Sequence, residues 1–120
     1  MFVSSLSNCK EFIAGDNTHL RELLHPAKQS LAVHYSLAHA HLASGEISLK
    51  HRLRTSEVYY ILSGQGRMHV NDEVRLVGPG DAVYIPPEAS QHIESLGPGE
   101  LTFLCIVDPA WKSEDEIIEA

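Results

Sequence analysis

From Leu31 onward the chain is a succession of short apolar runs separated by residues that favour turns. β-branched and aromatic side chains are common in the runs, and Gly, Pro, Asn, Asp and Ser interrupt them. No stretch of helical periodicity lies between one run and the next. The pattern therefore excludes a parallel sheet with crossover helices and leaves an antiparallel sandwich, jelly roll or barrel. The predicted strands are residues 31–42, 46–53, 57–62, 66–70, 73–77, 82–86, 91–95 and 101–107.

The chain has 120 residues, a length that suits one compact domain. We expect a single domain over residues 1–120, in which residues 31–107 form an all-β barrel. Residues 1–30 would then be an N-terminal arm, and residues 108–120 a C-terminal tail. The sequence contains no internal repeat and no low-complexity linker.

Short helices are predicted in the arm and in the tail. Leu20, Leu23 and Leu24 have the spacing of one helical face, and Asp16 precedes them as a candidate N-cap. In the tail, residues 113–116 have the spacing of a capping box. We expect the acidic residues of this C-terminal helix to face solvent while the helix docks on the sheet.

The charge and the cysteines narrow the class of protein. The chain has 16 acidic and 9 basic residues, a net charge of −7, and its basic residues are scattered, which argues against nucleic acid as a partner. No apolar run approaches the roughly 18 residues of a membrane-spanning helix, and the start of the chain lacks the pattern of a secretory signal. We therefore expect a cytoplasmic protein without a membrane partner. Cys9 and Cys105 form no CxxC pair, and Cys105 is predicted to be a small buried residue.

Eight histidines are an unusually high count for a chain of this length. One of them, His51, lies in residues 45–57, the stretch that most strongly indicates a functional site. Alternate side chains of a strand share a face, so His51 and Leu53 point the same way, and a tight turn brings Glu57 beside them. Tyr59 shares the face of Glu57 by the same alternation. A largely apolar cavity with a few convergent polar groups is typical of a small-molecule site.

Two motifs around these residues resemble those of the cupins. The first cupin motif is Gly, five residues, His-x-His, three residues, Glu, six residues, Gly; the second is Gly, five residues, Pro-x-Gly, two residues, His, three residues, Asn. The likeness spans residues 35–107 and is to small single-domain cupins of the mannose-6-phosphate isomerase-like kind. It implies a double-stranded β-helix, or jelly-roll barrel, that pairs as a homodimer and holds a divalent metal ion in its mouth. The matching residues are Gly45, His51, Glu57 and Gly64 in the first motif and Gly80 and Pro86 in the second.

The chain departs from the motifs at Leu53, Glu88, Gln91 and Ser95. The resemblance implies His51 and Glu57 as metal ligands, with the Gln91 amide oxygen in place of an imidazole. Such a site would bind more weakly than three histidines and a glutamate, and its donors suit zinc, manganese, iron or nickel without choosing among them. In the alternative interpretation no metal binds, and His51 and Glu57 satisfy each other by a hydrogen bond inside the pocket.

Two functions are compatible with this pattern. The first is a metal-dependent enzyme that acts on a small organic molecule, with the ion as Lewis acid and Glu57 or Tyr59 moving a proton. The second is a non-catalytic small-ligand-binding cupin with a degenerate metal site. The sequence leaves open whether the protein is an enzyme. No Lys or Arg falls on the inward strand positions, so a buried phosphate would lack a cation.

The residues on the outer surface of the barrel bear on the oligomeric state. By alternation His39 and His41 lie on an outer or dimer-interface face. His69 and His92 also face outward by alternation, unless a bulge at Pro87 reverses the orientation of His92. The predicted strand 31–42 has apolar side chains on both faces, so its outer face is not fully polar. Proteins seldom leave such a face in water, and pairing about a two-fold axis is the commonest way to cover it. We therefore expect a homodimer.

Overall fold

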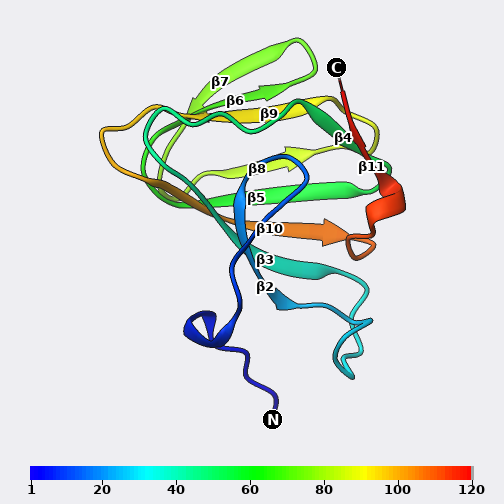
Figure 1. The fold of residues 1–120 in the computed structure, drawn as a ribbon. Helices are drawn as coiled ribbons and strands as arrows, with labels where there is room; N and C mark the ends of the chain where they lie inside the picture. Colours follow the sequence, from blue (N-terminus) through cyan, green and yellow to red (C-terminus); the bar gives the residue numbers. More distant parts are fainter. Residues whose placement is uncertain (120) are drawn as a thin grey trace.

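The computed structural model describes residues 1–119 as two antiparallel sheets stacked as layers (Figure 1). One sheet contains β1 (Phe12–Ile13), β2 (His19–Leu24), β3 (Ser36–Leu42), β10 (Leu101–Asp108), β5 (Ser56–Ser63) and β8 (Ala82–Ile85), in that order. The other contains β11 (Glu116–Ile118), β4 (His51–Leu53), β9 (Gln91–Ser95), β6 (Gly66–Val70) and β7 (Glu73–Val77). The predicted all-β jelly-roll barrel is confirmed. Residues 1–119 contain no helix that could span a membrane.

Strict alternation places the core between the two sheets. In β10 the side chains of Leu101, Phe103, Cys105 and Val107 are buried, and the intervening residues are partly exposed. β3 alternates in the same way, so its alanines point inward while its histidines point outward, as predicted. The Phe103 ring packs on Tyr59 of the neighbouring β5, with ring centroids 4.6 Å apart. Apolar burial of this kind supplies most of the stability of such a barrel.

The helix predicted around Leu20 is wrong. Residues His19–Leu24 form β2, which pairs antiparallel with β3 and places Leu20 opposite Ala40. A segment this short is a marginal helix, whereas the edge of β3 offers its backbone hydrogen-bond partners and Leu20 packs against the core. The arm contains one turn of 3-10 helix, Leu6–Asn8, and Asp16 caps no helix.

Only a 3-10 turn, Ser113–Asp115, forms where the C-terminal helix is predicted, and no side-chain bond caps it. The chain then continues as β11, which pairs antiparallel with β4 and places Glu116 opposite Leu53 and Ile118 opposite His51. The expectation that the acidic residues of the tail face solvent is therefore wrong for Glu116. A strand in this position directs that carboxyl group toward the end of the barrel where His51 lies.

Candidate functional site

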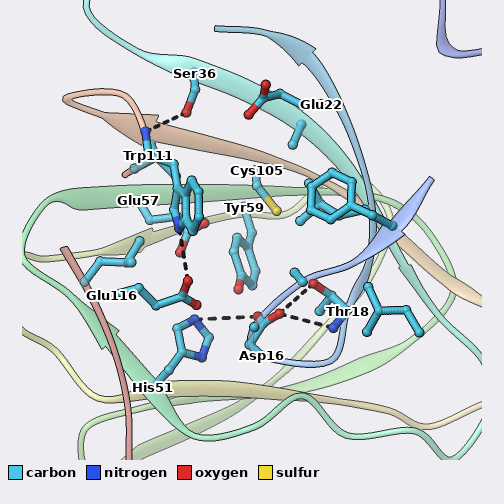
Figure 2. Close-up of a pocket in the computed structure, with 18 of the residues that line it drawn as sticks. Asp16, Thr18, Glu22, Ser36, His51, Glu57, Tyr59, Cys105, Trp111 and Glu116 are labelled. Carbon is cyan, nitrogen blue, oxygen red and sulfur yellow. Dashed lines mark hydrogen bonds and ion pairs between the residues drawn. The ribbon is translucent and has the colours of Figure 1, made fainter. Parts of the chain in front are cut away.

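A cavity of about 410 Å³ lies between the arm, the strands and the tail (Figure 2). Most of its wall is apolar, and its polar groups are side chains from several separate segments, which is the usual composition of a small-molecule pocket. The arm supplies the loop between β1 and β2, the barrel supplies β4 and β5, and the tail supplies β11. The polar side chains that matter below are Asp16, His51, Glu57, Tyr59 and Glu116.

Three of the predicted site residues form one buried network. Tyr59 and Glu57 lie on the inward face of β5, and Gln91 lies on the facing β9. The Tyr59 hydroxyl donates to Gln91 Oε1 at 3.1 Å, and Gln91 Nε2 donates to Glu57 Oε1 at 3.0 Å. Burial raises the pKa of Tyr59 well above its usual value, so the phenol keeps its proton and remains a donor. Gln91 thus has both ends of its amide engaged within the barrel.

Glu57 is a protonated acid at neutral pH. Burial raises the pKa of its carboxyl group to about 8, and the neighbouring Asp16 and Glu116 act in the same direction, while the hydrogen bond from Gln91 opposes them. Since the Gln91 amide donates to Oε1, Glu57 Oε2 is the oxygen left to carry the proton. A carboxylic acid that stays neutral near pH 7 can donate that proton to a ligand.

His51 turns its Nε2 toward the same cavity. Its Nδ1 donates to the Leu49 carbonyl oxygen at 2.8 Å, which fixes the orientation of the ring. Nε2 lies 3.6 Å from Asp16 Oδ2. Within the part of the chain described, no hydrogen bond joins His51 to Glu57, since each pairs with other groups. The expected convergence of an imidazole and a carboxyl group on one cavity is present.

Two polar residues of the cavity, Asp16 and Glu116, come from outside the recognised motifs. Asp16 is 6% exposed, and its Oδ1 accepts hydrogen bonds from the Thr18 backbone nitrogen at 3.1 Å and from Thr18 Oγ1 at 2.7 Å. The Asp-x-Thr sequence favours such a turn, but an aspartate before a helix would give the same pattern, so the sequence alone does not distinguish the two. Glu116 accepts from Trp111 Nε1 at 3.2 Å, and Figure 2 shows both carboxyl groups directed toward the His51 ring. Burial raises the pKa of Glu116, although His51 lowers it in part.

The cavity is rich in acidic groups and poor in cations. Asp16, Glu57 and Glu116 share it with one imidazole. Lys28 also lines the cavity, but its Nζ lies 2.6 Å from the Glu22 carboxylate, and its side chain is largely exposed. Because that ammonium group is already paired, it offers little to a phosphate. The arrangement favours ligands that donate hydrogen bonds and disfavours anions.

The predicted metal ligands fit this arrangement poorly. The Gln91 oxygen is occupied by Tyr59, and the proton of Glu57 would have to leave before its carboxylate could bind an ion. Of the three, His51 turns its Nε2 toward the cavity, where that nitrogen lies 3.6 Å from Asp16 Oδ2. The set His51, Glu57 and Gln91 therefore stays a prediction. A different His/Glu cluster, on the outer side of the six-stranded sheet, has ligand atoms within 4.8 Å of one another and could hold an ion; it consists of Glu11, His19 and His41.

Comparison with known proteins places this fold in a family. The sequence matches the cupin domain over residues 38–107. It is also 42% identical over 112 residues to an uncharacterised protein of Methanocaldococcus jannaschii, a match that covers 92% of this chain and 89% of that relative. The chain belongs to the cupin domain family. The finer likeness to mannose-6-phosphate isomerase-like cupins stays a prediction.

Solved structures agree on the fold. A nucleoside dehydratase from Streptomyces, also solved with uridine, is 20% identical with a TM-score of 0.79, and the match covers 99% of this chain and 91% of that one. A predicted oxalate decarboxylase from Thermotoga maritima is 23% identical with a TM-score of 0.78, covering 90% of this chain and 99% of that one. At these identities the likeness shows a shared cupin barrel.

Proposed function

We propose that the barrel mouth binds a small, uncharged, hydroxyl-bearing organic molecule and transfers protons on it by general acid–base catalysis. The observation that carries the proposal is the presence, in one cavity, of a Glu57 carboxyl group whose pKa burial raises to about 8 and of a His51 imidazole whose Nε2 faces the cavity. A carboxylic acid that can donate a proton and an imidazole that can accept one are the parts that an acid–base mechanism requires.

The ligand class follows from the lining. Carboxyl groups of Asp16 and Glu116 accept hydrogen bonds from hydroxyl groups but repel phosphates and carboxylates. Trp111 and Phe12 also line the cavity and add apolar surface for a ring. The Streptomyces dehydratase that shares this fold is solved with uridine, an uncharged molecule with hydroxyl groups and a ring, and this supports the same class for the present chain.

The simplest reaction that uses both groups is elimination of water. His51 Nε2 would take a proton from a ligand carbon, and the nearby Asp16 carboxylate would stabilise the imidazolium that forms. As the C–O bond breaks, Glu57 Oε2 would give its proton to the departing hydroxyl group, which leaves as water. Tyr59 acts through Gln91, whose amide fixes the orientation of Glu57, so we assign it a positioning role.

Calorimetric titration tests this function. We expect uridine or adenosine to bind and their 5′-monophosphates to bind at least about tenfold more weakly, because a single repulsive charge contact in a partly buried site costs more than about 1.4 kcal/mol. His51→Ala should weaken nucleoside binding and abolish loss of water as followed by mass spectrometry. The matched control is His69→Ala, which changes an outward histidine of β6. Equal binding of the monophosphates, or a His51→Ala variant that retains full activity, would contradict the proposal.

Elemental analysis separates this function from the metal-dependent alternative. We expect the purified protein to catalyse the reaction after treatment with a chelator. A stoichiometric metal ion that is lost in His51→Ala and is required for turnover would instead support the ligand set His51, Glu57 and Gln91. Binding of nucleosides without any turnover would favour the non-catalytic alternative.

A further inference from the structure

We propose that Glu11, His19 and His41 form a binding site for a borderline divalent cation of the Zn²⁺ class on the outer face of the barrel. His19 in β2 lies directly opposite His41 in β3, and their rings stack with centroids 4.9 Å apart. Glu11, which immediately precedes β1, faces both rings. Its Oε1 lies 2.6 Å from His41 Nε2, and its Oε2 lies 3.6 Å from His19 Nδ1.

The composition of the cluster suits zinc. Two imidazoles and one carboxylate, with a fourth position open to water, are a known three-ligand zinc set. The two histidine side chains are half-buried, with exposed fractions of 29% for His19 and 23% for His41, whereas Glu11 is an exposed residue. Partial burial of the two rings reduces competition from solvent there, and the exposed Glu11 side leaves an entry path for the ion. Arg21 Nη2 lies 3.8 Å from Glu11 Oε1 and is the nearby cation that an incoming ion must displace from the carboxylate.

The groups behind the two rings are the second observation. His19 Nε2 lies 3.7 Å from Glu46 Oε1, and His41 Nδ1 lies 3.0 Å from Glu100 Oε2. Each ring therefore turns one nitrogen toward Glu11 and the other toward a further carboxylate, but neither outer contact is a hydrogen bond: the His19 contact is too long, and His41 Nδ1 is buried without a hydrogen-bond partner. Metal-binding histidines characteristically donate their second nitrogen to a carboxylate, so ion binding would require the Glu46 and Glu100 side chains to close on the two rings. The Ala43 backbone nitrogen in turn holds Glu46 Oε1 at 2.6 Å.

A second pair of stacked histidines has a carboxylate beside it that contacts only one of the two rings. On the outer face of the five-stranded sheet, the His69 and His92 rings stack with centroids 4.0 Å apart, and Glu94 lies beside them. Glu94 Oε2 lies 2.7 Å from His69 and 3.5 Å from Arg67, so the carboxylate is shared between one imidazole and a guanidinium group. This cluster has the same residue types as the Glu11 site, but its carboxylate does not face both rings. His69 is therefore a suitable control position for zinc binding.

Ion binding at this site would act on the barrel mouth through the arm. The short strand β1 pairs with β2 through two residue pairs, Phe12 with Leu20 and Ile13 with His19. Phe12, Ile13 and the following Asp16 wall the cavity. An ion that ties Glu11 to β2 and β3 would hold this wall in place. Ion and cavity ligand should therefore favour each other, by linkage through the ordered arm.

Zinc titration by calorimetry tests the site, with His51→Ala as the parent protein so that the barrel mouth contributes no imidazole. We expect one Zn²⁺ per chain in the parent. Glu11→Gln and His41→Ala should each weaken binding at least about tenfold, and Glu46→Gln should weaken it by about tenfold through the His19 ring. His69→Ala should bind zinc as the parent does. Circular dichroism verifies that each variant is folded.

Hydrogen exchange gives a readout that is independent of the titration. Zn²⁺ should slow exchange of the backbone amides of residues 11–16 in the parent but not in Glu11→Gln. Zinc binding that survives both Glu11→Gln and His41→Ala, or that falls equally in His69→Ala, would overturn the proposal. Should His41→Ala fail to fold, His19→Gln takes its place with the same expected loss. None of these outcomes depends on nucleoside binding, so failure here leaves the proposed function standing.

Discussion

At the residue scale, Glu57 owes its chemistry to burial. Its side chain lies among apolar groups and two further carboxyl groups, and this environment raises its pKa to about 8. The unfolded chain exposes the same carboxyl group to water, where the pKa is near 4.5. Between these two values the folded protein binds one more proton than the unfolded chain does. The protonation of Glu57 is therefore linked to stability.

This linkage predicts the pH dependence of folding. Because the folded state binds the extra proton, the contribution of Glu57 to the free energy of unfolding should be greatest below pH 4.5. That contribution should fall as the pH rises from 4.5 to about 8. Glu57→Gln removes the titrating group but keeps an amide of similar shape. Urea unfolding at several pH values between 5 and 8 should show a shallower decline in the variant than in the wild type. Equal declines in the two proteins would contradict the assigned protonation of Glu57.

The Tyr59 hydroxyl offers a second prediction at this scale. Tyr59→Phe keeps the ring on Phe103 but removes the donor to the buried Gln91 oxygen. We expect a loss of about 1–3 kcal/mol in the free energy of unfolding, since a buried acceptor is left without a partner. The neighbouring Tyr60 is 41% exposed on the other face of β5, so Tyr60→Phe should change stability by less than about 0.5 kcal/mol. A similar effect of the two substitutions in urea unfolding would contradict the network.

At the element scale, the turn between β8 and β9 carries a residue in an unfavourable conformation. Glu88 has φ of 68°, in the left-handed region, at the position where the second cupin motif has glycine. A side chain in this region costs about 1–2 kcal/mol, which exceeds the entropic cost of glycine. Glu88→Gly should therefore raise the free energy of unfolding by about 0.5–1 kcal/mol.

The matched control for this turn is Glu88→Ala, which removes the carboxylate but keeps a Cβ in the same conformation. It should give no such gain, because the exposed contact between Glu88 and Arg52 at 3.8 Å contributes little. Thermal or urea unfolding of the three proteins checks both expectations. A gain in Glu88→Ala equal to that in Glu88→Gly would mean that charge, and not backbone strain, limits this turn.

The elements also explain how far the sequence could predict this protein. Most strands of the barrel were predictable from their alternation and from the turn residues between them, and β6, β7 and β9 begin and end where the pattern places them, although β7 exposes four of its five residues. The strands predicted at residues 31–42 and 46–53 are shorter, because β3 begins at Ser36 and β4 at His51. His51, Glu57 and Tyr59 followed from the motif and from parity. Asp16 and Glu116 did not, because they are carried into the cavity by β2 and β11, which are short strands that form by pairing with β3 and β4. Local spacing contains no signal for such pairing.

At the scale of the whole molecule, the outer face of the six-stranded sheet has an apolar band. Its members lie directly opposite one another across β3, β10, β5 and β8 and are Leu37, Ile106, Val58 and Tyr84. Tyr84 is 64% exposed. We propose that this face pairs with a second copy of the chain about a two-fold axis, the commonest way of covering such a surface.

Light scattering at low micromolar concentration tests the homodimer. We expect a mass of about twice 13.3 kDa. Tyr84→Glu should shift the mass toward that of one chain, since a charge would be buried in the interface. Val74→Glu is the matched control, because Val74 is similarly exposed at 57% but lies on β7 of the other sheet. A wild-type mass near 13.3 kDa would contradict the pairing.

The most direct test of the central claim is to locate a bound nucleoside by nuclear magnetic resonance. Uridine added to the ¹⁵N-labelled protein should shift the backbone amides of residues 12–18, 51–59 and 111–116, which surround the barrel mouth. These shifts should be absent in His51→Ala at the same concentration. Shifts confined to the second hollow, which is lined by Met68, Val70 and Tyr84, or no shift with uridine at all, would contradict the account.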